Sequence, residues 1–243
     1  MHYFPIGTFL FLVFWMLLAM VFVLFQIGVL RHVFAILGVN RRYVFALLVL
    51  SLLGSYINIP VATLPAKEVH SGQIINFFGM QYVVPTVVDW PRTVIAVNVG
   101  GAIIPFILSV YLILKHKQFF KSLLAVAIMA WIVHQMARPV PGVGIAVPVF
   151  VPPSLAALIA VLISRQYAAP LAYIGGSLGT LIGADLLNLN KIQGLGAPVA
   201  SIGGAGKFDG IFLTGLIAVL LAGIISRWTR EPEPPVQEDF REA

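Results

Sequence analysis

Long apolar stretches with almost no charge dominate this chain. Residues 1–30 contain no Asp, Glu, Lys or Arg, and similar stretches recur as far as about residue 225. A helix needs roughly 20 apolar residues to cross about 30 Å of hydrocarbon. Charged residues make up 10% of the chain, whereas a soluble domain carries about 25%. The sequence therefore predicts an all-α fold, a polytopic bundle of transmembrane helices.

Seven stretches are long enough to span a bilayer, or nearly so. We expect spans at about 4–30, 43–59, 93–114, 119–136, 145–163, 168–187 and 208–225. The first stretch lacks a basic N-terminal region and a small-residue cleavage site, so we interpret it as a retained span rather than a signal peptide. Residues 1–229 would then form a single transmembrane domain.

The basic residues predict how the chain is threaded, because cytoplasmic loops are enriched in Lys and Arg. With the N-terminus outside, ten basic residues lie inside: Arg31, Arg41, Arg42, Lys115, Lys117, Lys121, Arg165, Arg227, Arg230 and Arg241. Five lie outside: Lys67, Arg92, Arg138, Lys191 and Lys207. We expect a multi-pass protein of a prokaryotic inner (plasma) membrane with a cytoplasmic C-terminus.

Composition also excludes several kinds of chemistry. The chain has no Cys, which rules out disulfides, a thiolate nucleophile and Cys-ligated metal centres. The isoelectric point is near 9.8, but the basic residues stand singly between apolar runs, which is typical of topology signals rather than of nucleic-acid binding. We expect the lipid bilayer as a partner, no nucleic acid, and neither a cofactor nor a metal.

Two segments outside the expected spans have distinct patterns. The outer loop, residues 60–92, contains two short apolar runs within 73–84 around Gly79, which predict a β-hairpin that either caps the outer face or acts as a lid. The C-terminal tail, residues 230–243, is acidic and Pro-rich. It has too few apolar residues to fold alone, so we expect a disordered cytoplasmic tail able to dock on a membrane-protein partner.

Residues 139–154 are apolar but interrupted by Pro and Gly. An interior Pro removes a helical hydrogen bond and clashes with the preceding turn, so this segment is not a continuous helix. Non-helical backbone at membrane depth needs protein or a water-filled cavity to satisfy it. The pattern predicts either a re-entrant segment or a tight extended loop at the outer interface.

Five candidate site residues are polar side chains within or beside the expected spans, all on the outer half of the bilayer. They are Asn98, His134, Arg138, Asp185 and Asp209. Polar groups at this depth are costly and mark candidate substrate or ion sites. Two carboxylates within about 5 Å would share one proton, and Asp185 and Asp209 end and begin consecutive spans.

Each of these residues also has a structural interpretation. Asp209 would then interact with the dipole of its own helix as a first-turn acid. Asp185 would pair with Arg138 or Lys191. His134 would lie at the headgroup level, and Asn98 would hydrogen-bond a neighbouring helix.

Three stretches carry a resemblance to a known family: Asn98-Val-Gly-Gly-Ala-Ile-Ile-Pro, Gly183-Ala-Asp-Leu-Leu-Asn-Leu and residues 196–215. On these, residues 58–225 resemble the uncharacterised membrane family called domain of unknown function 1614, which implies no known activity. A looser similarity links the two acids to presenilin and prepilin-peptidase intramembrane aspartyl proteases. Their Gly-x-Gly-Asp motif is not matched here, since Lys207 and Phe208 separate Gly206 from Asp209.

Three functions remain open from the sequence. In a small transporter or permease, Asp185, Asp209 and Asn98 would bind a cation, a proton or a small polar solute, with His134 and Arg138 modulating the charge. In a diaspartyl hydrolase, Asp185 and Asp209 would be catalytic, one activating water and the other protonating the leaving group. In a non-catalytic subunit of a larger membrane complex, the Gly-rich helix faces would pack against partners.

Overall fold

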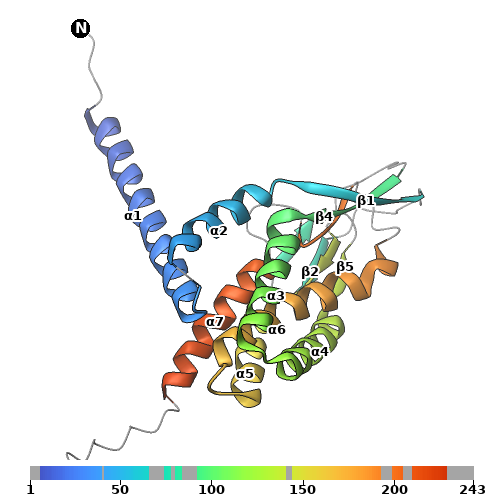
Figure 1. Ribbon diagram of the computed structural model, residues 1–243. Coiled ribbons are helices and arrows are strands. Elements are labelled where there is room, and N and C mark those ends of the chain that lie inside the picture. The colour runs from blue at the N-terminus through green and yellow to red at the C-terminus, as the bar shows by residue number, and fades with distance from the viewer. Residues whose placement is uncertain are drawn as a thin grey trace, which may run out of the picture.

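The computed structural model describes residues 6–39, 41–65, 74–77, 80–83, 92–140, 144–192, 199–204 and 210–228. The chain is mostly helical, with a small mixed sheet at one end (Figure 1). The α-helices are α1 (Ile6–Ile36), α2 (Arg41–Gly54), α3 (Ile104–His116), α4 (Phe119–Met136), α5 (Val151–Ile163), α6 (Ala168–Thr180) and α7 (Gly210–Trp228). Three further turns extend them: the π-helical η1 (Val99–Ile103) and η2 (Leu181–Asp185), and the 3₁₀-helical η3 (Leu186–Lys191).

The largest sheet has three strands in the order β1-β4-β7. Strand β4 (Arg92–Asn98) pairs antiparallel with β1 (Asn58–Pro65) and parallel with β7 (Val199–Ile202). This sheet was not predicted, because residues 93–98 were assigned to a transmembrane span. The strand ends at Asn98 and the helical backbone begins at Val99. The helix therefore begins about six residues later than the third span was expected to begin.

Two hairpins complete the strands. The predicted outer hairpin is confirmed in its two strands, β2 (Ile74–Phe77) and β3 (Met80–Val83), which pair antiparallel. The Pro- and Gly-interrupted segment, residues 139–154, is not a continuous helix, as predicted, although its last four residues begin α5. It forms a second antiparallel pair, β5 (Arg138–Val140) with β6 (Gly144–Ala146), and the helical backbone begins only at Val151.

Three helical stretches are long and apolar enough to cross a membrane: Val99–His116, Phe119–Met136 and Ala168–Lys191. They coincide with three of the seven expected spans. The other four spans are not shown. Helices α2 and α5 have 14 and 13 residues, fewer than the roughly 20 that a bilayer requires.

The core is built around α6, whose membrane-length stretch is the most buried of the three. Residues of α3, α6 and α7 share one apolar cluster with the last turns of α1, and α4, α5, α6 and α7 share a second. Close packing against α4 depends on glycine. A Cβ added to Gly183 would lie only 2.5 Å from the Ala130 carbonyl oxygen.

The contacts along α6 give the direction of its neighbours. Gly175 faces Ala125 and Gly183 faces Ala130, so α4 runs parallel to α6. Helix α7 runs antiparallel to α6. Ile211, at the N-terminal end of α7, packs with Leu181, just after the C-terminal end of α6.

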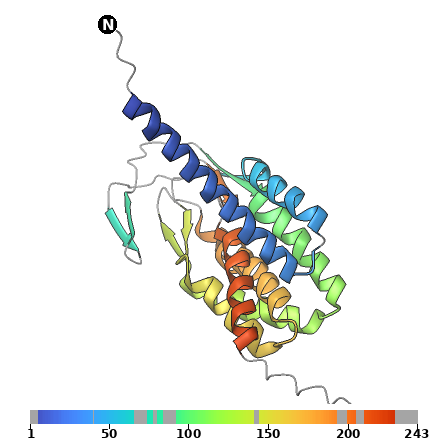
Figure 2. The ribbon, with the colours of Figure 1, turned by 90° about the vertical axis from the view of Figure 1, so that its left-hand side faces the viewer.

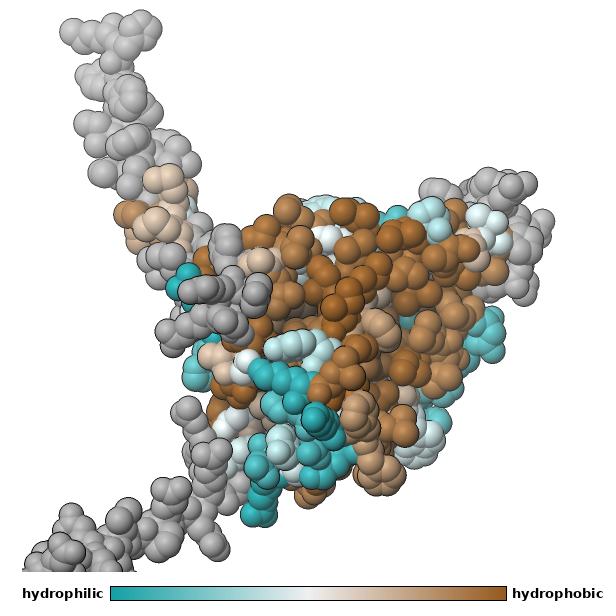
Figure 3. Space-filling view, viewed as in Figure 1, coloured by the Kyte–Doolittle hydropathy of each residue, from teal (hydrophilic) through white to brown (hydrophobic). Residues whose placement is uncertain are grey.

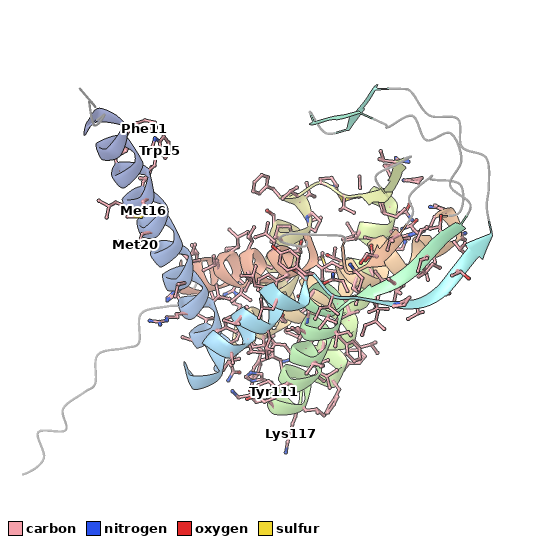
Figure 4. The ribbon with its side chains drawn as sticks, turned by 90° about the horizontal axis from the view of Figure 1, so that it is seen from above. Phe11, Trp15, Met16, Met20, Tyr111 and Lys117 are labelled. Atoms are coloured by element: carbon pink, nitrogen blue, oxygen red, sulfur yellow. The ribbon has the colours of Figure 1, made fainter. Side chains whose placement is uncertain are left out.

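Among the α1 side chains that the structure describes, the buried ones are Val33 and Phe34 near its C-terminus, and Leu37 just after the helix is buried with them. Figures 1 and 2 both show its N-terminal half extending beyond the other helices. Figure 4 shows Phe11, Trp15, Met16 and Met20 along this half, outside the bundle. All four are more than half exposed. In Figure 3 hydrophobic residues likewise cover most of the described surface, and hydrophilic residues gather in a patch low on that face.

Candidate functional site

Asn98 stands where β4 passes into η1, and its side chain is fully used. The side-chain Oδ1 accepts a hydrogen bond from the Gly101 N–H at 2.8 Å, which caps the start of the π-helical turn. The Nδ2 group donates to the Ser55 carbonyl at 2.8 Å and to Asn58 Oδ1 at 3.0 Å. Only 1% of the residue is exposed. These bonds satisfy the hydrogen-bonding groups of a buried amide. They favour the structural role of Asn98, hydrogen bonding to neighbouring elements, over a role in binding.

The hydrogen bonds of Asn98 continue into the third strand of the sheet. The Ser201 hydroxyl of β7 donates to the same Asn58 Oδ1, at 2.6 Å. Because Asn58 opens β1, Asn98 closes β4 and Ser201 lies within β7, this chain of bonds connects all three strands at one end of the sheet. The network connects β7 to the turn that Asn98 caps.

The turn after Asn98 packs against α2 with no space between the backbones. A Cβ added to Gly100 would lie 2.2 Å from the Ser51 carbonyl oxygen and 2.4 Å from the Ser55 nitrogen. The Ser51 hydroxyl also donates to the Gly100 carbonyl at 3.1 Å. Only a residue without a side chain fits at position 100, and this contact holds the start of η1 against the end of α2.

Asp185 closes η2, the π-helical turn that continues α6. One of its carboxylate oxygens accepts a hydrogen bond from the Gly203 N–H at 2.7 Å. Gly203 follows β7 with φ at +91°, a left-handed backbone conformation that glycine adopts without strain. A Cβ added there would lie 2.6 Å from both the nitrogen and the Cβ of Ala102 in η1. Asp185 therefore holds the end of β7 against η1, the turn that leads into α3.

These contacts bring together the three stretches on which the family resemblance rests. Asp185 binds the Gly203 N–H, Gly203 packs against Ala102, and the same turn is capped by Asn98. We call this group, made of Asn58, Asn98, Asp185, Ser201 and Gly203, the Asn98–Asp185 junction. It lies at the end of α6 where the sheet meets the helices.

Asp185 is the only acid among the residues that the structure describes, and it has no cation beside it there. The residue is half-buried. Arg138 and Lys191, the expected partners, are exposed. No salt bridge connects either of them to Asp185 within the described ranges, and no other hydrogen bond of the Asp185 carboxylate occurs in that part of the chain. The predicted pairing of Asp185 with Arg138 or Lys191 is thus not formed.

His134 lies near the end of α4 and is half-buried. Its Nδ1 is enclosed and makes no hydrogen bond to any described residue. Asp209 lies outside the described residues, as do Lys207 and the tail, residues 230–243. The predicted facing of Asp185 and Asp209, and the docking of the tail on a partner, stay predictions.

Sequence reasoning did not assign roles to several residues that the structure places here. Asn188 has no exposed surface, and its Nδ2 donates to the carbonyls of Gly183 and Ala184, both at 2.9 Å, beside Asp185. Asn58 and Ser201 were likewise not singled out. The available signal was weak for all three, since a single polar residue at the end of an apolar run is also typical of an ordinary span boundary.

A family model described as "Protein of unknown function (DUF1614)" matches residues 52–221, more than half of the chain. That range contains the whole Asn98–Asp185 junction, and it agrees with the resemblance inferred for residues 58–225. No curated protein and no solved structure matches the chain. The looser similarity to presenilin and prepilin peptidases gains no support from these comparisons.

Proposed function

We propose that this chain, which belongs to the DUF1614 family of proteins of unknown function, is a small membrane transporter that binds a cation or a proton at Asp185. The observation that carries the proposal is a half-buried carboxylate at the end of the most buried apolar helix, with no cation paired to it in the described ranges. An ionised group in such surroundings is costly unless a counter-ion or a proton neutralises it.

The local backbone supports a binding role for Asp185. Only one of its carboxylate oxygens is engaged by a described residue, through the Gly203 N–H. The other is left to accept a proton or to coordinate an ion. Asp185 also ends a π-helical turn, and single π-turns inside α-helices occur frequently at functional sites. Transporters commonly place ion sites at such irregular helix ends.

The transporter is tested by removing the charge while keeping the hydrogen bond. In Asp185→Asn the side-chain carbonyl still accepts from Gly203, so the fold is retained. We expect purified protein in liposomes to dissipate a gradient of protons, Na⁺ or Rb⁺, measured with an entrapped pH dye or radioactive tracers. Asp185→Asn should lower that flux about tenfold or more, because the site no longer carries charge. Glu238→Gln, which removes one acid from the tail, is the matched control.

Two results would contradict the proposal. One is equal flux of all three ions into liposomes with and without the wild-type protein. The other is a flux that Asp185→Asn and Glu238→Gln leave equally unchanged, provided that both variants elute as single species in detergent.

We also propose that the N-terminus lies outside and the C-terminus in the cytoplasm of the cell. The distribution of basic residues supports this orientation, because Lys117 would then lie inside and Lys191 outside. The chain has no Cys, so a single introduced Cys gives an unambiguous signal. We expect an impermeant maleimide to label Lys191→Cys on intact cells and Lys117→Cys only after permeabilisation, since both positions are exposed. The reverse pattern, or labelling of both in intact cells, would refute the orientation.

A further inference from the structure

Helix α6 carries three buried hydroxyl groups whose oxygens make no hydrogen bond of regular geometry to a described residue. Tyr173 and Ser177 have no exposed surface, and Thr180 is 5% exposed. Their hydroxyl oxygens make no hydrogen bond of regular geometry there, not even to the preceding turn of their own helix. Leaving such a group unsatisfied costs about 1–3 kcal/mol, so three on one helix call for an explanation beyond packing.

The three hydroxyls lie on one side of α6. Their spacing, four and then three residues, places them one above another on the same helical face, and the Ser177 hydroxyl lies beside that of Tyr173. The opposite face is occupied by Gly175, Gly179 and Gly183, which pack against α4. We call Tyr173, Ser177 and Thr180 the hydroxyl line.

The π-helical turn brings Asp185 to the end of this line. The Leu186 N–H donates to the Leu181 carbonyl, five residues earlier, so this turn is wider than an α-helical one. Thr180 and Asp185, which are also five residues apart, are therefore one turn apart. In a regular α-helix the same spacing would rotate the carboxylate away from the hydroxyl line.

The spacing of neighbouring side chains along the line matches a bridge of one water molecule. Side chains one turn apart have Cβ atoms about 5–6 Å apart, and a water between two oxygens spans about 5.6 Å, twice an O–H···O distance of about 2.8 Å. A metal cation instead needs several oxygens converging at about 2.0–2.6 Å. Oxygens spread along a helix do not converge, so the line suits water and protons rather than a metal ion.

We infer that the hydroxyl line binds buried water and carries protons along α6 to Asp185. This inference rests on the proposed function and names the proton as its ion. At each step a hydroxyl oxygen accepts a proton from its neighbour on one side and releases its own proton to the neighbour on the other. The last water protonates the Asp185 carboxylate, so one proton moves and no other bond changes.

The hydroxyl line is tested by Ser177→Ala and Thr180→Val. Each removes one hydroxyl and leaves the helix backbone intact, because these hydroxyls make no hydrogen bond of regular geometry to the described backbone. We expect each to lower proton flux in liposomes about tenfold, the effect of about 1.4 kcal/mol on the barrier. The matched control is Ser122→Ala on α4, which removes an equally buried and unpartnered hydroxyl away from the line. Flux in Ser177→Ala and Thr180→Val equal to that in Ser122→Ala would overturn the inference.

The outcomes separate this inference from the proposed function. If Asp185→Asn lowers proton flux while Ser177→Ala and Thr180→Val do not, the transporter stands and the hydroxyl line is wrong. If Ser177→Ala and Thr180→Val lower flux while Asp185→Asn does not, the line conducts and Asp185 is not the binding site.

A measurement without flux tests whether water reaches the line. Hydroxyl-radical footprinting with mass spectrometry modifies side chains that contact water. We expect Tyr173 to be modified although it has no exposed surface, and Met129, equally buried on the α4 side, to be protected. Protection of Tyr173 to the same degree as Met129 would count against buried water.

Discussion

Replacing Gly100 by alanine should disrupt the packing of η1 against the end of α2 and destabilise the protein. The added methyl group would lie 2.2 Å from the Ser51 carbonyl oxygen and 2.4 Å from the Ser55 nitrogen. Both are backbone atoms, so no side-chain rotation relieves the clash. Separating the two segments would also lengthen the hydrogen bond from Ser51 to Gly100. We expect a loss of about 3 kcal/mol or more, at the upper end of overpacking effects.

The measurement is thermal unfolding of the detergent-solubilised protein, followed by size-exclusion with tryptophan fluorescence. Gly100→Ala should lower the midpoint by roughly 10 °C or more, or abolish the folded peak. The control is Gly28→Ala in α1, where an added Cβ meets nothing within 4 Å and the helix gains propensity. A Gly100→Ala midpoint within about 2 °C of the Gly28→Ala midpoint would show that the contact is not as close as described.

The helical part of the fold was largely predictable because long apolar runs encode it directly. Residues 119–136 were predicted as a span and form α4 with the same bounds. For this helix, the length of the apolar run and its low content of charged residues were sufficient for the prediction. A helix that spans hydrocarbon must satisfy its backbone locally, so its signal lies in one continuous stretch of sequence.

The three-stranded sheet was missed because hydropathy does not separate a short buried strand from a helix. Residues 93–97 read Thr-Val-Ile-Ala-Val, and their β-branched residues favour a strand. That preference was outweighed by the apolar run that follows. The pairing partner of β4 in β7 lies about a hundred residues later, so the decisive interaction is not local.

Two residues of the Asn98–Asp185 junction were identified from the sequence, but their contacts were not. Asp185 and Asn98 were both identified, because polar groups in apolar surroundings are conspicuous. Their partners are backbone groups, the Gly203 N–H and the Gly101 N–H, which composition does not reveal. Asp185 was expected to meet another charged side chain. It instead meets an N–H that is available because Gly203 adopts a left-handed conformation.

Asn98→Asp should destabilise the protein about as strongly as the change at Gly100, for an electrostatic reason. The Nδ2 group of Asn98 donates to the Ser55 carbonyl and to Asn58 Oδ1. An ionised aspartate side chain has the same shape but no donor, so it would place an oxygen against two acceptors and bury a charge at a position only 1% exposed. An unpaired buried charge costs about 3–5 kcal/mol, and the midpoint in the same thermal assay should fall accordingly.

The matched control for this change is Asn190→Asp, the same substitution at an exposed position of η3. There the carboxylate stays hydrated, so the midpoint should move little. In Asn98→Asp, protonation at low pH gives the introduced carboxyl group one O–H donor, which restores a bond to only one of the two acceptors. Lowering the pH should therefore recover part of the lost stability in Asn98→Asp and none in Asn190→Asp. Equal midpoints for the two variants at neutral pH would mean that the Asn98 hydrogen bonds do not hold the strands to the helices.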